Sequence, residues 1–234
     1  RWGIHIRSQT STNSVADSYR NTVIRNRIEF SGLETTDYGA ISVIAYTNAP
    51  PDNTTLSHNA IRDAVGAKSF LVTHLNRKRG SLQSPFMSFG VYLDNEASGY
   101  QVHGNVILRT ERASLFFHNG ATNNVTGNVF VNASNTAGSD GQIVSTGAKG
   151  YSHGNKFDRN VVAWGLTPTN ALWEGSYAAN NDDPALLPYL ETVDDNRYLY
   201  SGDDLEDLLN NSLLTPAGSW SDWLEAGFDR NSLV

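Results

Sequence analysis

Short apolar stretches broken by asparagine and glycine dominate the first 180 residues. Segments such as NTVIRNRIEF, GNVILRT and NVTGNVFVNA are rich in Val, Ile, Thr and Phe. This composition predicts brief β-strands joined by tight turns. The spacing of an amphipathic helix is nearly absent before residue 185. The pattern therefore predicts an all-β chain.

One six-residue motif recurs along the chain: an apolar residue, two others, an asparagine, one more residue and a second apolar residue. Its copies are at least 23 residues apart and often farther, which is typical of a solenoid coil with inserted loops. In stacked coils the asparagine amides can bond to those above and below, and asparagine adopts the left-handed backbone conformation at low cost. We interpret the six asparagines as a structural ladder in that conformation: Asn26, Asn59, Asn105, Asn128, Asn160 and Asn196.

Residues 181–234 follow a different pattern, with Asp-Asp pairs and clustered leucines. SGDDLEDLLNNSLL predicts a short helix capped by Ser201 or Asp203, and SWSDWLEAGF predicts a second one. The acids lack the alternating spacing of a calcium loop, so we predict no metal site. We divide the chain into β coils over 1–180 and a C-terminal coil with helical segments over 181–234, packed on the coils within the same domain.

Composition excludes several classes of function. The chain carries a net charge of −7, and its 17 Lys and Arg residues are scattered, whereas nucleic-acid binding needs clustered cations. No apolar run approaches the roughly 20 residues of a membrane-spanning helix. Cysteine is absent, which excludes disulfides and thiolate metal sites. The sequence also lacks phosphate-loop, dinucleotide, zinc-helix and nucleophile-elbow motifs, so we expect no cofactor.

Both ends of the sequence break off inside a pattern. RWGIHIRSQ begins directly in a strand-like alternation, with Arg1 instead of an initiator methionine, and the last residue is the apolar Val234. We expect a chain truncated at both ends, which leaves open its association with the missing remainder or with other subunits.

Candidate chemistry follows the stretch FGVYLDNEASG, where acids come directly after an expected strand. Beside such acids, the aromatic faces of Tyr92 and Phe116 would suit the apolar side of a pyranose, and the polar groups would take its hydroxyls. Aligning GAISV, GVYLD, SLFFH and QIVST as successive strands places four residues in one column: Val43, Asp94, His118 and Thr146.

These features resemble the right-handed parallel β-helix proteins, many of which cut or bind polysaccharides. The most similar group that we identify is glycoside hydrolase family 141 with its uncharacterised relatives, whose activities include α-L-fucosidase and xylanase. The resemblance is carried by TTDYGAISV, GVYLDNEASG and FFHNGATNNVTGNVFVN, and the tail WSDWLEAGFDRNSLV also fits. It implies a secreted hydrolase, extracellular or periplasmic, that acts on a polysaccharide or oligosaccharide through Asp94 and Asp37. Asn95 departs from the pattern, because the group often has a second Asp there.

Glycoside hydrolysis uses two carboxyl groups about 5 to 9.5 Å apart. In the alignment, Asp37 begins one strand and Asp94 ends the next, about 20 Å away if both strands run straight. The pair therefore requires a turn at Asp37 or a different register, and Glu96 is the alternative partner. The candidate substrate-binding residues are His118, Glu96, Asn95, Tyr92 and, in the long loop between residues 66 and 88, His74.

Structural interpretations stay open beside the chemical ones. Asp94, Asp37 and His118 each occur in turn-like sequence, where a polar side chain can satisfy its own backbone. For Phe116 we favour a place in an aromatic stack inside the coil over contact with a sugar.

Three functions fit the sequence. The first is a glycoside hydrolase. The second is a polysaccharide lyase, with Arg62, Lys68 or Arg112 to neutralise a uronate carboxylate. The third is a non-catalytic glycan-binding or structural β-helix, such as an adhesin or spike-like protein, because an uncapped end coil invites stacking.

Overall fold

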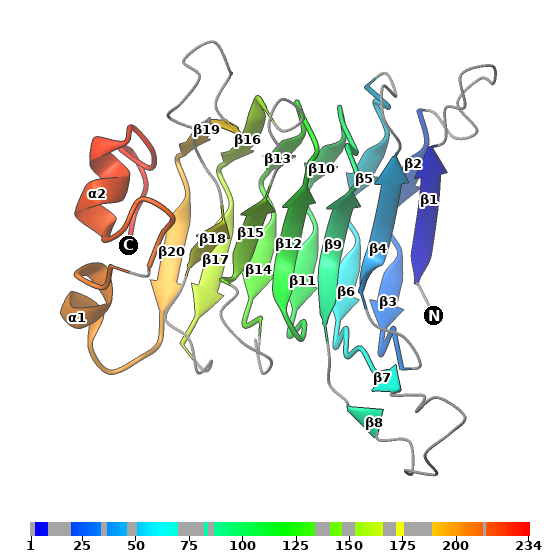
Figure 1. Cartoon of the computed structure of the whole chain (residues 1–234), viewed down its shortest axis with the longest axis horizontal. Coiled ribbons are helices and arrows are strands. Elements are labelled where there is room, and N and C mark those ends of the chain that lie inside the picture. The colour runs from blue at the N-terminus through cyan, green and yellow to red at the C-terminus, as the bar shows by residue number, and fades with distance from the viewer. Residues whose placement is uncertain are drawn as a thin grey trace, which may run out of the picture.

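Three parallel sheets of six strands each form the body of the protein (Figure 1). The computed structural model describes residues 3–8, 20–33, 37–45, 51–69, 82–83, 87–133, 141–146, 153–165, 172–175, 189–212 and 214–234. The chain visits the three sheets in turn, so that each coil adds one strand to each sheet. The prediction of an all-β chain with parallel strands is confirmed.

Each sheet is named here by its edge strands. The β1–β18 sheet contains, in spatial order, β1 (Ile4–Ser8), β4 (Tyr38–Ala45), β9 (Ser88–Asp94), β12 (Ala113–His118), β15 (Ile143–Thr146) and β18 (Trp173–Gly175). The β2–β19 sheet contains β2 (Thr22–Ile24), β5 (Thr55–Ser57), β10 (Gln101–His103), β13 (Asn124–Thr126), β16 (Asn155–Asp158) and β19 (Leu190–Asp194). The β3–β20 sheet contains β3 (Arg27–Glu29), β6 (Ala60–Arg62), β11 (Val106–Leu108), β14 (Val129–Val131), β17 (Val161–Trp164) and β20 (Arg197–Tyr200). A separate antiparallel pair joins β7 (Lys68–Ser69) to β8 (Leu82–Gln83).

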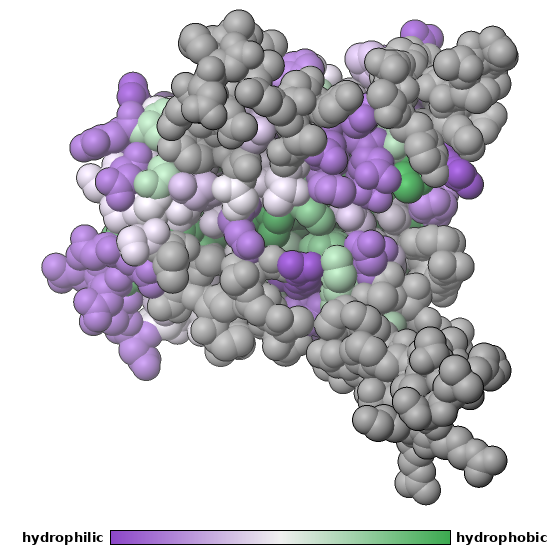
Figure 2. Space-filling view, viewed as in Figure 1, coloured by the Kyte–Doolittle hydropathy of each residue, from purple (hydrophilic) through white to green (hydrophobic). Residues whose placement is uncertain are grey.

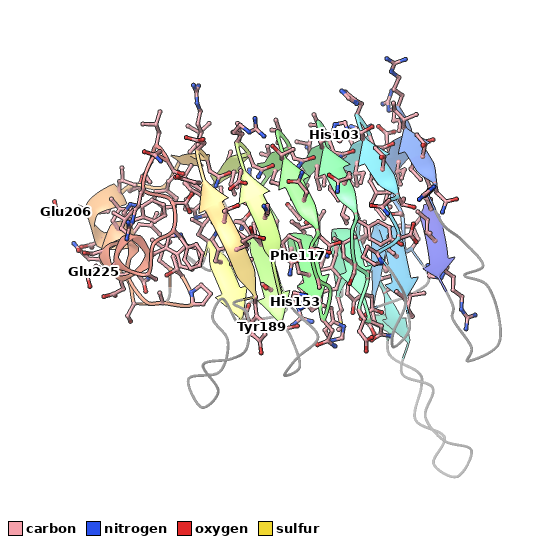
Figure 3. The ribbon with its side chains drawn as sticks, turned by 90° about the horizontal axis from the view of Figure 1, so that it is seen from above. His103, Phe117, His153, Tyr189, Glu206 and Glu225 are labelled. Atoms are coloured by element: carbon pink, nitrogen blue, oxygen red, sulfur yellow. The ribbon has the colours of Figure 1, made fainter. Side chains whose placement is uncertain are left out.

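Apolar side chains fill the space between the three sheets. Successive strand residues point to opposite faces, so a three-residue strand delivers one inward side chain per coil. Val102 of β10 and Ile107 of β11 are fully buried, and each aligns with an apolar residue of the neighbouring coil. Phe117 of β12 points into the same interior (Figure 3). One continuous core results, and its cohesion comes from apolar burial.

The six predicted asparagines form a continuous ladder along one corner of the coils. In each step, the backbone N–H and side-chain Nδ2 of one asparagine donate to Oδ1 of the next, at 2.8 to 3.3 Å. Nδ2 of Asn105 also donates to the Leu56 carbonyl oxygen at 2.9 Å. Because all of these asparagines except Asn26 are buried, the bonds satisfy polar groups that water cannot reach. The structural interpretation of the ladder is confirmed.

The left-handed backbone conformation lies one residue earlier than we expected. The residue before each ladder asparagine has φ between 54° and 64°, and the six are Arg25, His58, Gly104, Gly127, Arg159 and Asp195. The asparagine therefore contributes the hydrogen bonds of its side-chain amide. The residue before it adopts the left-handed turn conformation.

The C-terminal segment covers the last coil and ends the ladder. Asp229 accepts hydrogen bonds from Asn196 Nδ2 at 2.9 Å, from the Tyr198 hydroxyl at 2.8 Å and from Trp223 Nε1 at 2.8 Å. The N–H of Tyr198 donates to the carbonyl of Leu233, which extends the β3–β20 sheet by one bridge. The buried Trp223 joins the core of the coils.

Both predicted helices are present near the C-terminus: α1 (Leu205–Leu209) and α2 (Trp220–Glu225). The cap prediction for α1 was wrong, because Asp204, and neither Ser201 nor Asp203, accepts the bond from the Asp207 N–H. Ser219 caps α2 in a reciprocal capping box with Asp222. Among the described residues, no helix is long and apolar enough to cross a membrane.

We expect Asn105→Ala to lower the free energy of unfolding by about 3 kcal/mol, because it leaves buried donors on Asn59 without their acceptor and removes the side-chain donor to the Leu56 carbonyl. The control is Asn26→Ala at the half-buried end of the ladder, for which we expect a loss below about 1 kcal/mol. Urea denaturation followed by circular dichroism measures both. Equal losses for the two variants would contradict a cooperative buried ladder.

Candidate functional site

The outer face of the β1–β18 sheet carries an apolar patch that is separate from the core. The alternation of inward and outward residues slips at Gly90, because two consecutive positions face the core. A Cβ on Gly90 would lie 2.4 Å from the core residue Ile107, and the next residue, Val91, is itself part of the core. Phe89 and Tyr92 consequently both lie on the outer face. Figure 2 shows an apolar area near the middle of this face, bordered by hydrophilic residues. The patch consists of Phe89, Tyr92, Ala113, Val144, Met87 and Phe116.

Two aromatic rings of the patch stack across neighbouring strands. Tyr92 and Phe116 have ring centroids 4.9 Å apart and planes within 5° of each other. Gly39 makes room for them, because a Cβ there would lie 2.7 Å from Cβ of Tyr92. The predicted aromatic stack of Phe116 with Tyr92 is confirmed, but its expected location was wrong, since Phe116 lies outside the coil and is partly exposed. Tyr92 is only 5% exposed, so Phe116 offers the accessible ring.

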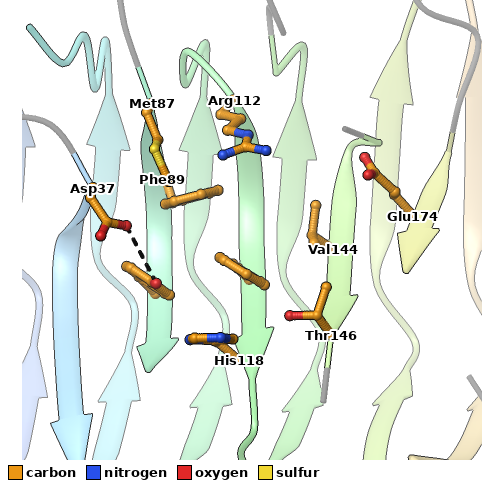
Figure 4. A pocket seen from close by; sticks show the side chains of 10 residues that line it. Asp37, Met87, Phe89, Arg112, His118, Val144, Thr146 and Glu174 are labelled. Carbon is orange, nitrogen blue, oxygen red and sulfur yellow. Dashed lines mark hydrogen bonds between the residues drawn. The ribbon is translucent and has the colours of Figure 1, made fainter. Parts of the chain in front are cut away.

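A pocket of about 290 Å³ opens over this patch. Figure 4 shows Asp37 at one side and Glu174 at the other, with Arg112 and His118 between them. The pocket crosses five adjacent strands, so its long direction runs from coil to coil. Its lining residues are Asp37, Met87, Phe89, Tyr92, Arg112, Phe116, His118, Val144, Thr146 and Glu174.

The predicted column of polar residues is present, with one correction. Ile44, and not Val43, aligns with Asp94 on β9. Val43 is fully buried and aligns with Leu93, whose side chain also points inward. Because neighbouring residues of a strand point to opposite faces, Val43 cannot align with Asp94, which points outward. The other members are placed as predicted, because the preceding pair of Phe117 and Leu93 brings His118 beside Asp94, and His118 aligns with Thr146.

Asp94 and His118 form a direct pair. Nδ1 of His118 lies 2.6 Å from Oδ1 of Asp94, and the imidazole N–H donates because an ionised carboxylate only accepts. The Asp94 side chain is 18% exposed and that of His118 is 34% exposed, so the carboxylate lies partly behind the ring. This contact orients the imidazole at the pocket.

Asp37 precedes β4 in a left-handed turn. Its φ is 53°, a conformation that aspartate adopts more readily than most residues, and its N–H donates to the Met87 carbonyl at 2.9 Å. The residue as a whole is exposed, but its carboxyl group is directed over the sheet toward the Tyr92 hydroxyl, 3.5 Å from Oδ1. Desolvation and then the negative charge of Asp94 raise the pKa of the Asp37 carboxyl, against the opposing effects of His118, Tyr92 and Arg112.

The Tyr92 hydroxyl brings the two acids into one group. It interacts with the carboxyl groups of both Asp37 and Asp94, and burial together with these charges raises the pKa of Tyr92, which therefore stays protonated. The turn at Asp37 that the pair requires is present, and the negative charge of Asp94 acts on the Asp37 carboxyl group.

Three other predicted site residues lie elsewhere. Asn95 and Glu96 form the turn after β9, with φ of 46° and 67°, and neither lines the pocket. The Ala97 N–H donates to the Asp94 carbonyl at 3.2 Å and closes this turn. The turn interpretation therefore accounts for Asn95 and Glu96. His74 lies outside the described residues.

Sequence reasoning missed Glu174 and undervalued Arg112. Glu174 aligns with Val144 at the far side of the pocket, and burial raises the pKa of its carboxyl while Arg112 opposes the shift. The guanidinium of Arg112 lies over the Phe89 ring, 5.8 Å from its centroid. The sequence signal for Glu174 was weak, because a polar residue after two apolar ones marks its place in the three-residue strand β18. Arg62, by contrast, pairs with Glu29 on another sheet.

Among the described residues, no three His, Asp or Glu side chains gather in a way that could hold a metal ion. Comparison with known proteins finds no matching protein family, no matching curated protein and no matching solved structure. The resemblance to glycoside hydrolase family 141 therefore stays a prediction. The functional argument depends on the chemistry of the pocket itself.

Replacing Tyr92 by Phe keeps the stacked ring and removes the shared hydroxyl. We expect the pKa of Asp37 to rise further, because the Tyr92 hydrogen bond lowers it in the native protein. Titration of carboxyl ¹³C signals by NMR measures this shift. Glu29, whose pKa is lowered by Arg62 and Arg27, is the internal control and should not move. An unchanged Asp37 titration would contradict the bridging role of the hydroxyl.

Proposed function

We propose that the chain is a carbohydrate-active enzyme that hydrolyses glycosidic bonds in a polysaccharide, with Asp37 and Asp94 as its pair of carboxyl groups. The single observation that carries this proposal is the Tyr92 hydroxyl, which interacts with both groups beside an open pocket. The turn at Asp37 and the effect of the Asp94 charge on the pKa of Asp37 support a close carboxyl pair of the kind that glycosidases use. The resemblance of TTDYGAISV and GVYLDNEASG to glycoside hydrolase family 141 supports the same pair.

The proposal includes a right-handed parallel β-helix as the scaffold. Three parallel sheets visited in turn support it, and connections between parallel strands are right-handed in about 98% of proteins. Because we propose a polysaccharide substrate, we also propose that the protein acts outside the cytoplasm, in the extracellular or periplasmic space.

Different environments assign different roles to the two acids. The raised pKa of Asp37 keeps a proton on its carboxyl group to a higher pH, so Asp37 acts as the general acid and protonates the oxygen of the leaving sugar. Asp94, which contacts His118, acts as an ionised carboxylate. It serves either as the base that activates the attacking water or as the nucleophile that attacks the anomeric carbon. Water completes hydrolysis by adding its hydroxyl to the anomeric carbon and a proton to the enzyme.

The remaining pocket residues bind the sugar. Phe116 presents a partly exposed ring against which the apolar face of a pyranose can pack. His118 and Thr146 lie side by side on adjacent strands and can bond to sugar hydroxyls. Tyr92 contributes mainly by its hydroxyl and by supporting Phe116 from beneath the pocket.

Arg112 favours a second candidate function, a polysaccharide lyase. Its guanidinium in the pocket could neutralise a uronate carboxylate while a base removes the adjacent proton. We rank this function second, because a uronate would also face the carboxyl groups of Asp37 and Glu174, which line the pocket. An unsaturated product that absorbs in the ultraviolet would favour the lyase.

We expect Asp94→Asn to reduce sugar release by about 100- to 10,000-fold while glycan binding stays measurable. Asp63→Asn is a matched control, because the Asp63 side chain is also 18% exposed and bonded to a cationic residue, Arg109, outside the pocket. Reducing-sugar assays across a broad glycan panel and binding isotherms measure the two quantities. Binding without turnover in the native protein would instead indicate a non-catalytic glycan-binding protein.

The pH profile tests the assignment of the acid. A carboxyl group with a raised pKa remains a proton donor to higher pH, so kcat/KM should fall as pH rises through the pKa of Asp37. Asp37→Asn should abolish this alkaline limb in the residual activity and leave the acidic limb in place. An unchanged alkaline limb would assign the proton donor to another group.

A further inference from the structure

The pocket extends well beyond the two acids of the proposed reaction. Asp37 precedes β4, whereas Glu174 lies on β18, four strand positions away in the same sheet. Parallel strands are about 4.8 Å apart, so the backbones at the two sides are about 19 Å apart. This span exceeds the width of a single pyranose ring. Val144 and Glu174 therefore lie beyond the sugar that contacts Asp37 and Asp94, and Arg112 lies between the two sides.

Glu174 has an oxygen whose hydrogen-bonding capacity the described residues do not use. Its Oε2 is buried and accepts no hydrogen bond within the described part of the chain. Its carboxyl group bonds to the backbone of Gly141, which fixes the side chain at the pocket wall. Buried polar atoms in folded proteins nearly always have partners, so this oxygen of a pocket-lining residue has the capacity for one more hydrogen bond.

The chemistry around Glu174 indicates the type of partner. Arg112 supplies N–H donors to the same side of the pocket and interacts electrostatically with the Glu174 carboxyl group. Val144, aligned with Glu174 and only 4% exposed, forms an apolar floor. An anion would be repelled by Glu174 and a cation by Arg112. A sugar hydroxyl, however, can donate to a carboxylate and accept from a guanidinium.

We propose that Arg112, Val144 and Glu174 form a second subsite that binds a neutral sugar unit through its hydroxyl groups, next to the unit held at Asp37 and Asp94. This subsite rests on the proposed carbohydrate-binding function and specifies its ligand as a neutral oligosaccharide of at least two units. The oligosaccharide lies across the strands of the β1–β18 sheet, along the long direction of the pocket.

The test compares binding of disaccharides and monosaccharides. The probes are gluco-, xylo-, manno- and galacto-configured disaccharides, their monosaccharides and digalacturonic acid, measured by isothermal titration calorimetry with Asp94→Asn to prevent turnover. We expect at least one neutral disaccharide to bind about tenfold or more tightly than its monosaccharides, and more tightly than digalacturonic acid. If no neutral disaccharide binds, or if digalacturonic acid binds best, the proposal is wrong.

Glu174→Gln keeps the size of the side chain and removes the carboxylate. This substitution should lower the affinity for the tightest-binding disaccharide by about tenfold and leave the affinity for monosaccharides unchanged. The control is Glu191→Gln, a half-exposed glutamate paired with Lys156 on the β2–β19 sheet, which should change neither affinity. Thermal unfolding of each variant confirms that it is folded. Equal weakening of both ligands by Glu174→Gln, or no weakening, would refute the subsite.

Failure of the subsite and failure of the hydrolase give different results. Disaccharide binding that depends on Glu174 without any turnover by the native protein would support the subsite and reject hydrolysis. Turnover that Asp94→Asn abolishes, combined with ligand affinities that are insensitive to Glu174→Gln, would support hydrolysis and reject the subsite.

Discussion

The ladder of buried asparagine amides fixes which residues of successive coils lie side by side. Consecutive ladder members are between 23 and 46 residues apart, yet each makes the same pair of bonds to the next. Loops of different length are thus inserted without any change in strand register. Because a slip by one residue would reverse the direction of every side chain in a strand, the whole outer face depends on this constraint.

The candidate site is a consequence of that register together with one local irregularity. The register brings Asp94 beside His118, and the slip in alternation at Gly90 turns two neighbouring aromatic residues outward. Desolvation at this patch, followed by the negative charge of Asp94, raises the pKa of Asp37. A carboxyl group with a raised pKa can serve as the general acid of an acid–base pair.

The pocket combines features that suit an extended uncharged ligand. Its acids and its one described arginine are distributed along the sheet, and an aromatic floor lies between them. A polymer that crosses the strands would meet the same type of surface at each coil, with spacing set by the sheet. Such a surface binds chains of sugar units more naturally than compact ligands, which agrees with both the proposed reaction and the second subsite.

The sequence alone determined the all-β architecture, the ladder and the neighbourhood of Asp94 and His118, because a repeated motif and the two-residue strand period are local properties. It did not determine the partner of Asp94 on β4, the side on which Phe116 lies, the approach of Asp37 or the presence of Glu174 in the pocket. These depend on a turn and on a slip in alternation, which change side-chain direction without a clear local signal, and on a strand of three residues that the sequence marks weakly. Only the packed coils bring such distant residues to one face, since their proximity is set by contacts between strands and not by spacing along the chain.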